Sequence, residues 1–287
     1  MGFAVATLAV APGLARAQPV DLFYERTVMT AAQQRCDLFA PQVAAALASA
    51  AAQARGAALR AGTSAGVLRQ VESSAQAKAA SVSCASPDIA TAAARVKSAF
   101  AGFAKVERLV YPGDILSWRA DRGSGRTNRW KLAQDVAFGP DRMAFGLAGR
   151  ENPGTLIAVA RFADGAEPYA ARLVLRDEDR SGQPYLNRWG GGATTNLPLD
   201  RRLPPAGALK AFTAAARSPA GQDLLPKDSA AGWAFRFPDA AALAVAGLDP
   251  RESIAVEFLF PGDVTRRAYV EVGDFAAGRA FLQLAQR

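Results

Sequence analysis

Residues Tyr111–Phe138, with the sequence YPGDILSWRADRGSGRTNRWKLAQDVAF, contain the point at which the hydrophobic pattern of the chain changes. Before Tyr111-Pro112-Gly113, apolar residues recur every three or four positions, which is the spacing of one helix face. After this point, apolar and polar residues alternate, as in a strand with one solvent-exposed face. One parity holds Trp130, Leu132, Val136 and Phe138, and the other holds Arg129, Lys131 and Asp135. The stretch therefore predicts a boundary between a helical part and a β part.

Three Ala-rich helices are expected on the N-terminal side of this boundary. Pro41 marks a bend or break in the first helix, because proline disrupts the helix ladder. The second helix is expected over residues 65–82. Ser86-Pro87-Asp88 predicts the start of the third, with an N-cap, a proline at the first helical position and an acidic first turn. The apolar face of the first helix consists of Val28, Ala32, Cys36, Phe39, Val43, Leu47, Ala50 and Ala54. That of the second helix consists of Val67, Val71, Ala75 and Val82. That of the third helix consists of Ile89, Ala93, Val96, Phe100, Phe103 and Val110.

Strands with short polar turns are expected on the C-terminal side, and short connections favour antiparallel pairing. A helix is expected over residues 206–216, and an amphipathic helix begins near Phe275. The further strands are expected at 143–147, 156–162, 169–175, 233–237, 254–260 and 268–272. The predicted class is α+β, with an N-terminal three-helix bundle followed by an antiparallel β meander or sandwich with a few late helices. The expected domains are 18–112, helical, and 113–287, mostly antiparallel β.

The first seventeen residues resemble an export signal in pattern. An apolar run from Phe3 to Val10 precedes Pro12 and Gly13, and Ala15-Arg16-Ala17 has the small-x-small pattern of a cleavage site. The usual basic residues before such a run are missing, which predicts a translation start further upstream. No stretch reaches the roughly 20 apolar residues of a transmembrane helix. We expect residues 1–17 to be a signal peptide, cleaved between Ala17 and Gln18, and the mature protein to be periplasmic or secreted without a membrane span.

The chain has two cysteines, Cys36 and Cys84. An even number in an oxidising compartment predicts a disulfide between them. The alternative is a pair of buried thiols. A redox pair is not favoured, because catalytic cysteines usually form C-x-x-C.

The chain carries a formal net charge of +8, supplied mainly by arginine. For an exported protein this predicts an anionic partner, such as an anionic glycan or a lipid head group, whereas nucleic acid is not expected outside the cytosol. An envelope protein is the other expected partner class. The alternative is that the charge serves solubility alone.

A basic segment lies between Trp118 and Trp130. It predicts a mobile hairpin flanked by two indoles, able to pair with phosphate or carboxylate groups while the rings stack on sugars. The alternative is an ordinary exposed turn whose tryptophans point into the core. The candidate anion-binding residues are Arg119, Arg122, Arg126, Arg129 and Lys131.

Residues 177–182, DEDRSG, resemble the first half of a calcium loop, since oxygen ligands alternate and a glycine follows. The second half is missing, because Arg188 stands where such a loop places a bidentate Glu. A weak calcium site on Asp177, Asp179 and Ser181 is one interpretation, and a charged hairpin turn is the other. No other cofactor is expected.

The chain contains no histidine. This excludes every nucleophile that depends on a Ser-His or Cys-His pair, including the G-x-S-x-G match at Gly62–Gly66, which a helix also precedes. We expect a non-enzymatic binding protein of the cell envelope. A carboxylate-based hydrolase of cell-wall or exopolysaccharide is the alternative, and a third possibility is that the helical part docks a partner helix.

Overall fold

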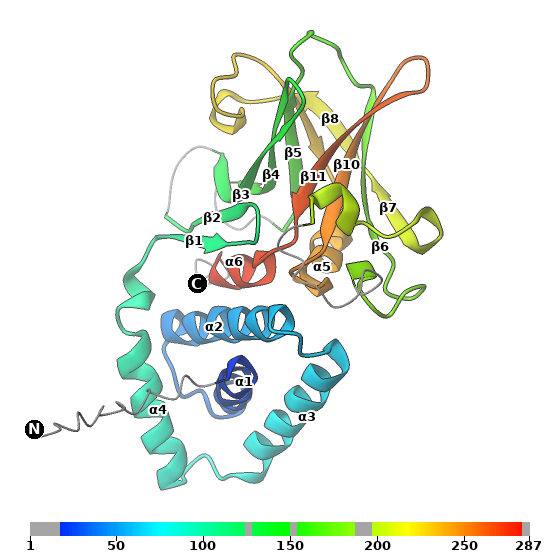
Figure 1. Cartoon of the computed structure of the whole chain (residues 1–287). Coiled ribbons are helices and arrows are strands. Elements are labelled where there is room, and N and C mark those ends of the chain that lie inside the picture. Colours follow the sequence, from blue (N-terminus) through cyan, green and yellow to red (C-terminus); the bar gives the residue numbers. More distant parts are fainter. Residues whose placement is uncertain (1–17, 124–127, 150–153, 187–196, 283–287) are drawn as a thin grey trace, which may run out of the picture.

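The computed structural model describes residues 18–123, 128–149, 154–186 and 197–282 (Figure 1). Helices form the N-terminal part and two antiparallel sheets form the rest, so the expected α+β class is confirmed. The expected signal peptide, residues 1–17, lies outside the described residues. No helix within the described ranges has the length and apolar character needed to cross a membrane.

Four helices, rather than three, make up the N-terminal part, because Pro41 starts a new helix instead of bending the first one. A proline at the first helical position has a suitable φ and lacks only an N–H that the helix would leave unbonded. Asp37 ends the preceding helix in a left-handed conformation, with φ of 49°. The helices are α1 (Pro19–Cys36), α2 (Pro41–Arg60), α3 (Ala65–Ser81) and α4 (Pro87–Phe100).

The predicted starts of the last two helices are confirmed by their N-caps. The Ser86 hydroxyl accepts a hydrogen bond from the Asp88 N–H at 3.2 Å. Ser64, the central residue of the G-x-S-x-G match, caps α3 by accepting from the Val67 N–H at 3.2 Å. That serine therefore belongs to a helix-turn-helix and not to a nucleophile elbow.

The predicted disulfide is confirmed. Cys36 and Cys84 are bonded, with 5.6 Å between their Cα atoms, and the chain has no free cysteine. The bond joins the end of α1 to the turn before α4, and thereby ties together helices that are far apart in sequence.

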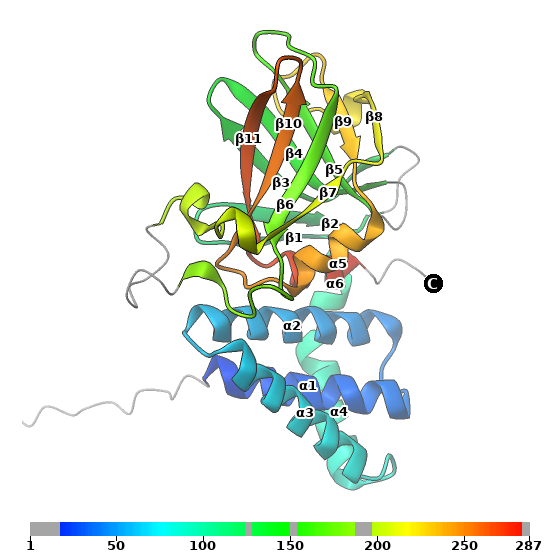
Figure 2. The ribbon, with the colours of Figure 1, turned by 90° about the vertical axis from the view of Figure 1, so that its right-hand side faces the viewer.

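Two sheets stack face to face, and all their neighbouring strands are antiparallel. Figure 2 shows β11, β10 and β6 as a layer in front of β3, β4 and β5. The seven-stranded sheet has the order β1 (Arg108–Pro112), β2 (Ser117–Asp121), β3 (Arg129–Phe138), β4 (Asp141–Gly149), β5 (Leu156–Arg161), β9 (Trp233–Arg236) and β8 (Ala216–Pro219). The four-stranded sheet has the order β11 (Val264–Glu271), β10 (Ser253–Phe260), β6 (Ala170–Arg176) and β7 (Leu209–Thr213).

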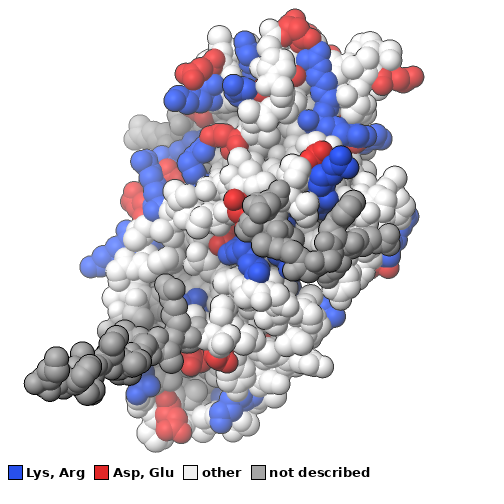
Figure 3. Space-filling view, in the orientation of Figure 1, with Lys and Arg blue, Asp and Glu red and all other residues white. Residues whose placement is uncertain are grey.

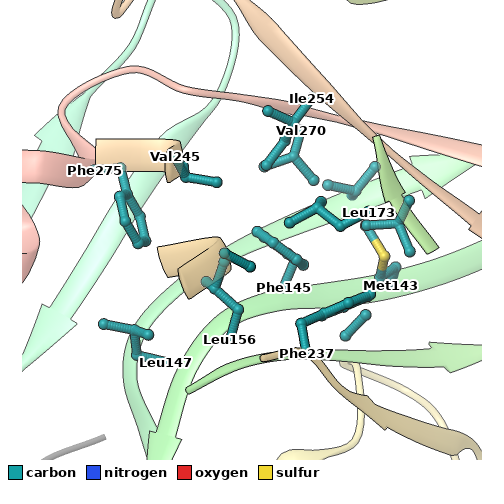
Figure 4. Close-up of a cluster of buried hydrophobic side chains, with 14 of the residues drawn as sticks. Met143, Phe145, Leu147, Leu156, Leu173, Phe237, Val245, Ile254, Val270 and Phe275 are labelled. Carbon is teal, nitrogen blue, oxygen red and sulfur yellow. The ribbon is translucent and has the colours of Figure 1, made fainter. Parts of the chain in front are cut away.

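The main core lies between these sheets. Phe145, Leu173 and Ile254, from β4, β6 and β10, are fully buried and share one cluster (Figure 4). Helix α5 (Asp239–Gly247), which the sequence did not predict, and helix α6 (Phe275–Leu282) add Val245 and Phe275 to the same cluster. The predicted strands and the C-terminal helix thus build one core.

The expected helix at 206–216 and the expected extent of the third helix are wrong. Residues 206–216 do not form a helix: a short 3-10 turn leads into β7, and β8 begins at Ala216. Pairing of β7 with β6 and of β8 with β9 lets the chain cross from one sheet to the other, which overrides the helix propensity of its alanines. Val110 is not on the third helix. Helix α4 ends at Phe100, and Val110 is exposed in β1, so the sheet includes residues that we assigned to the helical domain.

A bulge in β3 changes which face Trp130 occupies. The pairing of β3 with β4 shifts between Trp130 and Leu132, leaving Lys131 as the extra residue. Leu132 joins the main core, whereas Trp130 packs on the opposite face of the sheet, with Leu224 and Ala234. The parity that placed Trp130 with Leu132 is therefore wrong, since a bulge reverses alternation on one side of it.

Helix α2 joins the helical part to the β part through small and polar residues. The hydroxyls of Ser49 and Tyr111 lie 2.9 Å apart, and Ser49 also donates to the carbonyl of Ala277 at 3.0 Å. Arg60 forms an ion pair of 2.9 Å with Asp274. These contacts fix α2 against α6, and the two helices lie side by side in Figure 1.

The buried Tyr111 predicts a loss of stability at high pH. Burial raises the pKa of Tyr111 to about 12, whereas an unfolded tyrosine ionises near pH 10. The unfolded chain therefore loses its proton first, and stability present below pH 10 is lost as pH rises towards the folded pKa. Between pH 8 and pH 11 the free energy of unfolding should fall by about 1.4 kcal/mol more in the wild type than in Tyr111→Phe. Urea unfolding at several pH values measures this, and parallel profiles would contradict it.

Candidate functional site

A large groove lies between the free edges of two strands. β2 pairs with β3 only at Leu132 and Ala133, so the later residues of β3 have an unpaired edge. β11 is the edge of the other sheet. A groove of about 1120 Å³ lies between these edges, and we call it the seam groove. Its apolar lining includes Ile115, Leu116, Val136, Ala137, Phe138, Pro140, Leu199 and Tyr269.

The side chain of Gln134 bridges β3 and β11 beside the seam groove. Its amide N–H donates to the Glu271 carbonyl at 3.2 Å, and its carbonyl accepts from the Glu271 N–H at 2.8 Å. The amide thus bonds the edge of β11 as a neighbouring strand would. Because backbone groups alternate in direction along an antiparallel strand, the N–H and C=O of Arg267 and Tyr269 face the same edge as those of Glu271.

Arg266 lines one end of the seam groove. It donates to Asp141 at 3.2 Å and to Asp164 at 3.1 Å, and its guanidinium lies 4.8 Å from the ring centre of Phe260. The hydrogen bond from Arg266 lowers the pKa of Asp164 to about 2. Asp164 is therefore ionised at any physiological pH, and the charges at this end of the groove are paired.

A buried carboxylate fixes the loop that forms one wall. Glu271 accepts from the N–H groups of Asp114, Ile115 and Leu116, at 2.6, 2.9 and 2.7 Å. Only glycine fits at position 113, since a Cβ there would lie 2.3 Å from the carbonyl oxygen of Leu116. The loop therefore holds one shape, with Ile115 46% exposed at the groove.

Arg202 fixes the opposite wall to the same carboxylate. It is fully buried, donates to Asp114 at 3.1 Å, and lies 3.8 Å from Glu271. It also donates to the carbonyl of Leu197 at 2.9 Å, next to the turn η4 (Leu199–Arg202) that lines the groove. One buried ionic cluster thus positions both walls.

The seam groove combines apolar walls with backbone groups that no strand has paired. Within the described ranges, the seam-facing edges of β3 and β11 form no backbone hydrogen bond with another strand. An unpaired edge is a template for pairing with another chain. The arrangement can therefore bind an extended polypeptide through backbone hydrogen bonds and alternate apolar side chains.

The described basic residues of the Trp118–Lys131 segment have partners within the protein. Arg119 is ion-paired with Asp135 at 2.6 Å. Arg122 donates to the Phe103 carbonyl at 3.1 Å and lies over the Phe281 ring. Arg129 hydrogen-bonds the Gly123 carbonyl. Arg126 lies outside the described residues.

Lys131 and the two tryptophans of the segment point inward. Lys131 is 2% exposed and donates to the Gly123 carbonyl at 2.6 Å, and burial lowers its pKa. Trp118 is fully buried, and its indole N–H donates to the Val272 carbonyl at 2.9 Å. The indole N–H of Trp130 donates to the Leu224 carbonyl at 3.1 Å. Figure 3 shows basic and acidic side chains interspersed over the β part on this face. Binding of an anion by this segment stays a prediction.

Two residues of the expected calcium loop, Asp177 and Ser181, have side-chain partners within the protein. Asp177 is ion-paired with Arg180 at 3.1 Å and lies 4.0 Å from Lys210. Ser181 donates to the Gln183 carbonyl at 2.9 Å. In the part of the chain that the structure describes, no group of three or more His, Cys, Asp or Glu side chains is arranged to hold a metal ion, and this includes the surroundings of Asp179. Calcium binding also stays a prediction.

Sequence reasoning missed the residues that shape the seam groove. Gln134 carried a signal, because it is a polar residue in the parity of Leu132 and Val136, at a position where alternation predicts burial. Glu271 and Arg202 carried no such signal in the sequence, since each is a charged residue at a position where the pattern predicts solvent exposure. Their burial depends on a contact between segments distant in sequence.

Comparison of the chain with protein-family models, with curated proteins and with solved structures gives no significant match.

Proposed function

We propose that this protein is an exported, non-enzymatic binding protein that takes an extended segment of a protein partner into the seam groove by strand addition. The observation that carries this proposal is the pair of free strand edges that face each other across an apolar groove beyond Gln134. In strand addition, main-chain hydrogen bonds supply affinity, and pockets for alternate side chains supply specificity.

The register of β3 supports this mode of binding. β3 and β4 are joined by a two-residue turn, Gly139-Pro140, and Phe138 pairs with Asp141. If Phe138 and Asp141 exchange hydrogen bonds at the turn, alternation directs the N–H and C=O of Ala137 away from β4 and into the seam. Ala133 pairs with β2 on that same side, as the alternation requires.

The disulfide supports the exported location. Structural disulfides persist in oxidising compartments and are rare in the cytosol. The apolar run and the Ala-x-Ala pattern before Gln18 agree with this location. The mass of the protein isolated from its own cells tests the proposal, since the mature chain should begin at Gln18.

A binding role is better supported than hydrolysis. An acid–base pair needs one carboxyl group that holds a proton near neutral pH. Three carboxylates line the seam groove, Asp141, Asp164 and Asp200. Asp141 and Asp164 both accept hydrogen bonds from Arg266, and the pKa of Asp164 is lowered to about 2. Asp200 lies 3.9 Å from Arg201. Each carboxylate thus lies beside an arginine, an arrangement that does not favour the hydrolase alternative.

We expect Ala137→Pro to weaken peptide binding about tenfold or more. Proline removes the backbone N–H that faces the seam, and on an edge strand it leaves the pairing with β4 intact. A hydrogen bond contributes about 0.5–1.5 kcal/mol, and the proline ring adds a steric block. Peptides selected from a phage-displayed random library on the wild-type protein should show alternating apolar residues, and fluorescence polarisation then gives their affinities.

Two controls separate strand addition from a general apolar contact. Ala137→Ser keeps the N–H and should bind as the wild type does. A copy of the selected peptide with alternate backbone nitrogens methylated should lose its affinity, because it can no longer donate to a strand edge. Equal binding of the methylated peptide, or of Ala137→Pro, would contradict the proposal.

A further inference from the structure

A second groove lies in the helical part, remote in sequence from the seam groove. It has a volume of about 510 Å³ and is lined mainly by α1 and α4. Figure 1 shows α1 along its axis, between α2, α3 and α4. The floor is apolar and consists of Val28, Met29, Leu47, Val96 and Phe100.

The rim of this groove is basic. Three cations, Arg26, Lys78 and Arg95, line it together with one carboxylate, Glu25, which gives the lining a net formal charge of +2. Lys78 and Arg95 are exposed, and neither has a salt bridge within the described ranges. Arg26 donates to the Ala50 carbonyl at 2.8 Å, and burial lowers its pKa. The rim therefore complements an anionic group.

The size of the groove decides which kind of ligand fits. Ligand sites for small molecules span about 300–1,000 Å³ and are mostly apolar with few polar groups, and this groove has that size and composition.

We propose that the groove between α1 and α4 binds a single-chain anionic amphiphile, with the hydrocarbon chain on Met29, Val96 and Phe100 and a carboxylate head group at Lys78 and Arg95. Charge complementarity at the rim and the apolar floor together carry this inference. The site does not depend on the proposed role of the seam groove.

The probe for the test is 11-(dansylamino)undecanoic acid, whose emission rises on transfer into an apolar site. We expect saturable binding to the wild-type protein and displacement by palmitate. Lys78→Glu combined with Arg95→Glu should weaken binding at least about tenfold, because the rim then repels the head group. Ala99→Trp should abolish it, since Ala99 is an exposed residue of the lining and the indole would fill the groove.

Lys97→Glu is the matched control, because Lys97 is an exposed cation of α4 that does not line the groove. It should bind the probe as the wild type does, and circular dichroism should show all variants folded. Hexadecanol should displace the probe poorly. Unchanged affinity in Ala99→Trp would overturn the proposal. So would binding that occurs only to vesicles of dioleoylphosphatidylglycerol, which would indicate a membrane surface instead of a groove.

Discussion

Replacement of Glu271 by alanine is expected to lower the free energy of unfolding by about 3–5 kcal/mol, because three backbone N–H groups lose their acceptor and the buried Arg202 keeps only one of its two carboxylate neighbours, Asp114. Glu271 is fully buried and lies 3.8 Å from Arg202, itself without solvent exposure. The same substitution leaves the N–H groups of Asp114, Ile115 and Leu116 without their acceptor.

The variant should also lose binding at the seam groove. Both walls depend on this carboxylate, one through the 113–116 loop and the other through Arg202. Glu271→Gln keeps the volume but replaces one acceptor with an N–H₂ group that faces backbone donors. We therefore expect its stability to lie between those of the wild type and Glu271→Ala.

Urea unfolding followed by tryptophan fluorescence measures this effect. Asp135→Asn is a suitable control, because Asp135 forms an ion pair in which both side chains are about half exposed. Exposed pairs contribute about 0.2–1 kcal/mol, so this variant should stay within 1 kcal/mol of the wild type. Equal losses in the two variants would show that the buried cluster has no special role.

Loss of the disulfide is the second large effect. In the Cys36→Ser/Cys84→Ser variant, a loop with a sequence separation of 48 is no longer closed in the unfolded chain. The chain-entropy relation gives a loss of about 4 kcal/mol for a loop of this length. For a protein of this size that corresponds to a fall of about 7 °C in the thermal midpoint.

Two probes can locate the effect of the disulfide. All four tryptophans lie after residue 112, so their fluorescence reports on the β part, whereas ellipticity at 222 nm reports mainly on the helices. In the serine variant we expect the ellipticity transition to move to lower urea than the fluorescence transition. The wild type in a reducing agent should behave in the same way. Unchanged midpoints would contradict a stabilising role for the bond.

Several parts of the fold could be predicted because their cause is local. Ser86-Pro87-Asp88 starts a helix through its own backbone and side-chain groups, and the alternation around Phe145 and Leu156 marks strands with one buried face. The bulge at Lys131 could not be predicted, because it depends on how β3 meets β4. Residues 206–216 were wrongly predicted as a helix for the same reason, since sheet pairing outweighed local propensity.

The sequence by itself determined the α+β class, the placement of a helical part before a β part, the pairing of Cys36 with Cys84 and the exclusion of histidine-based catalysis, because each follows from residue type and spacing. Only the tertiary structure decided where the candidate binding surfaces lie. The seam groove exists because β3 and β11, far apart in the chain, present unpaired edges to each other. The cluster of Glu271, Arg202 and Asp114 is buried because the same long-range contact removes these charges from water and pairs them.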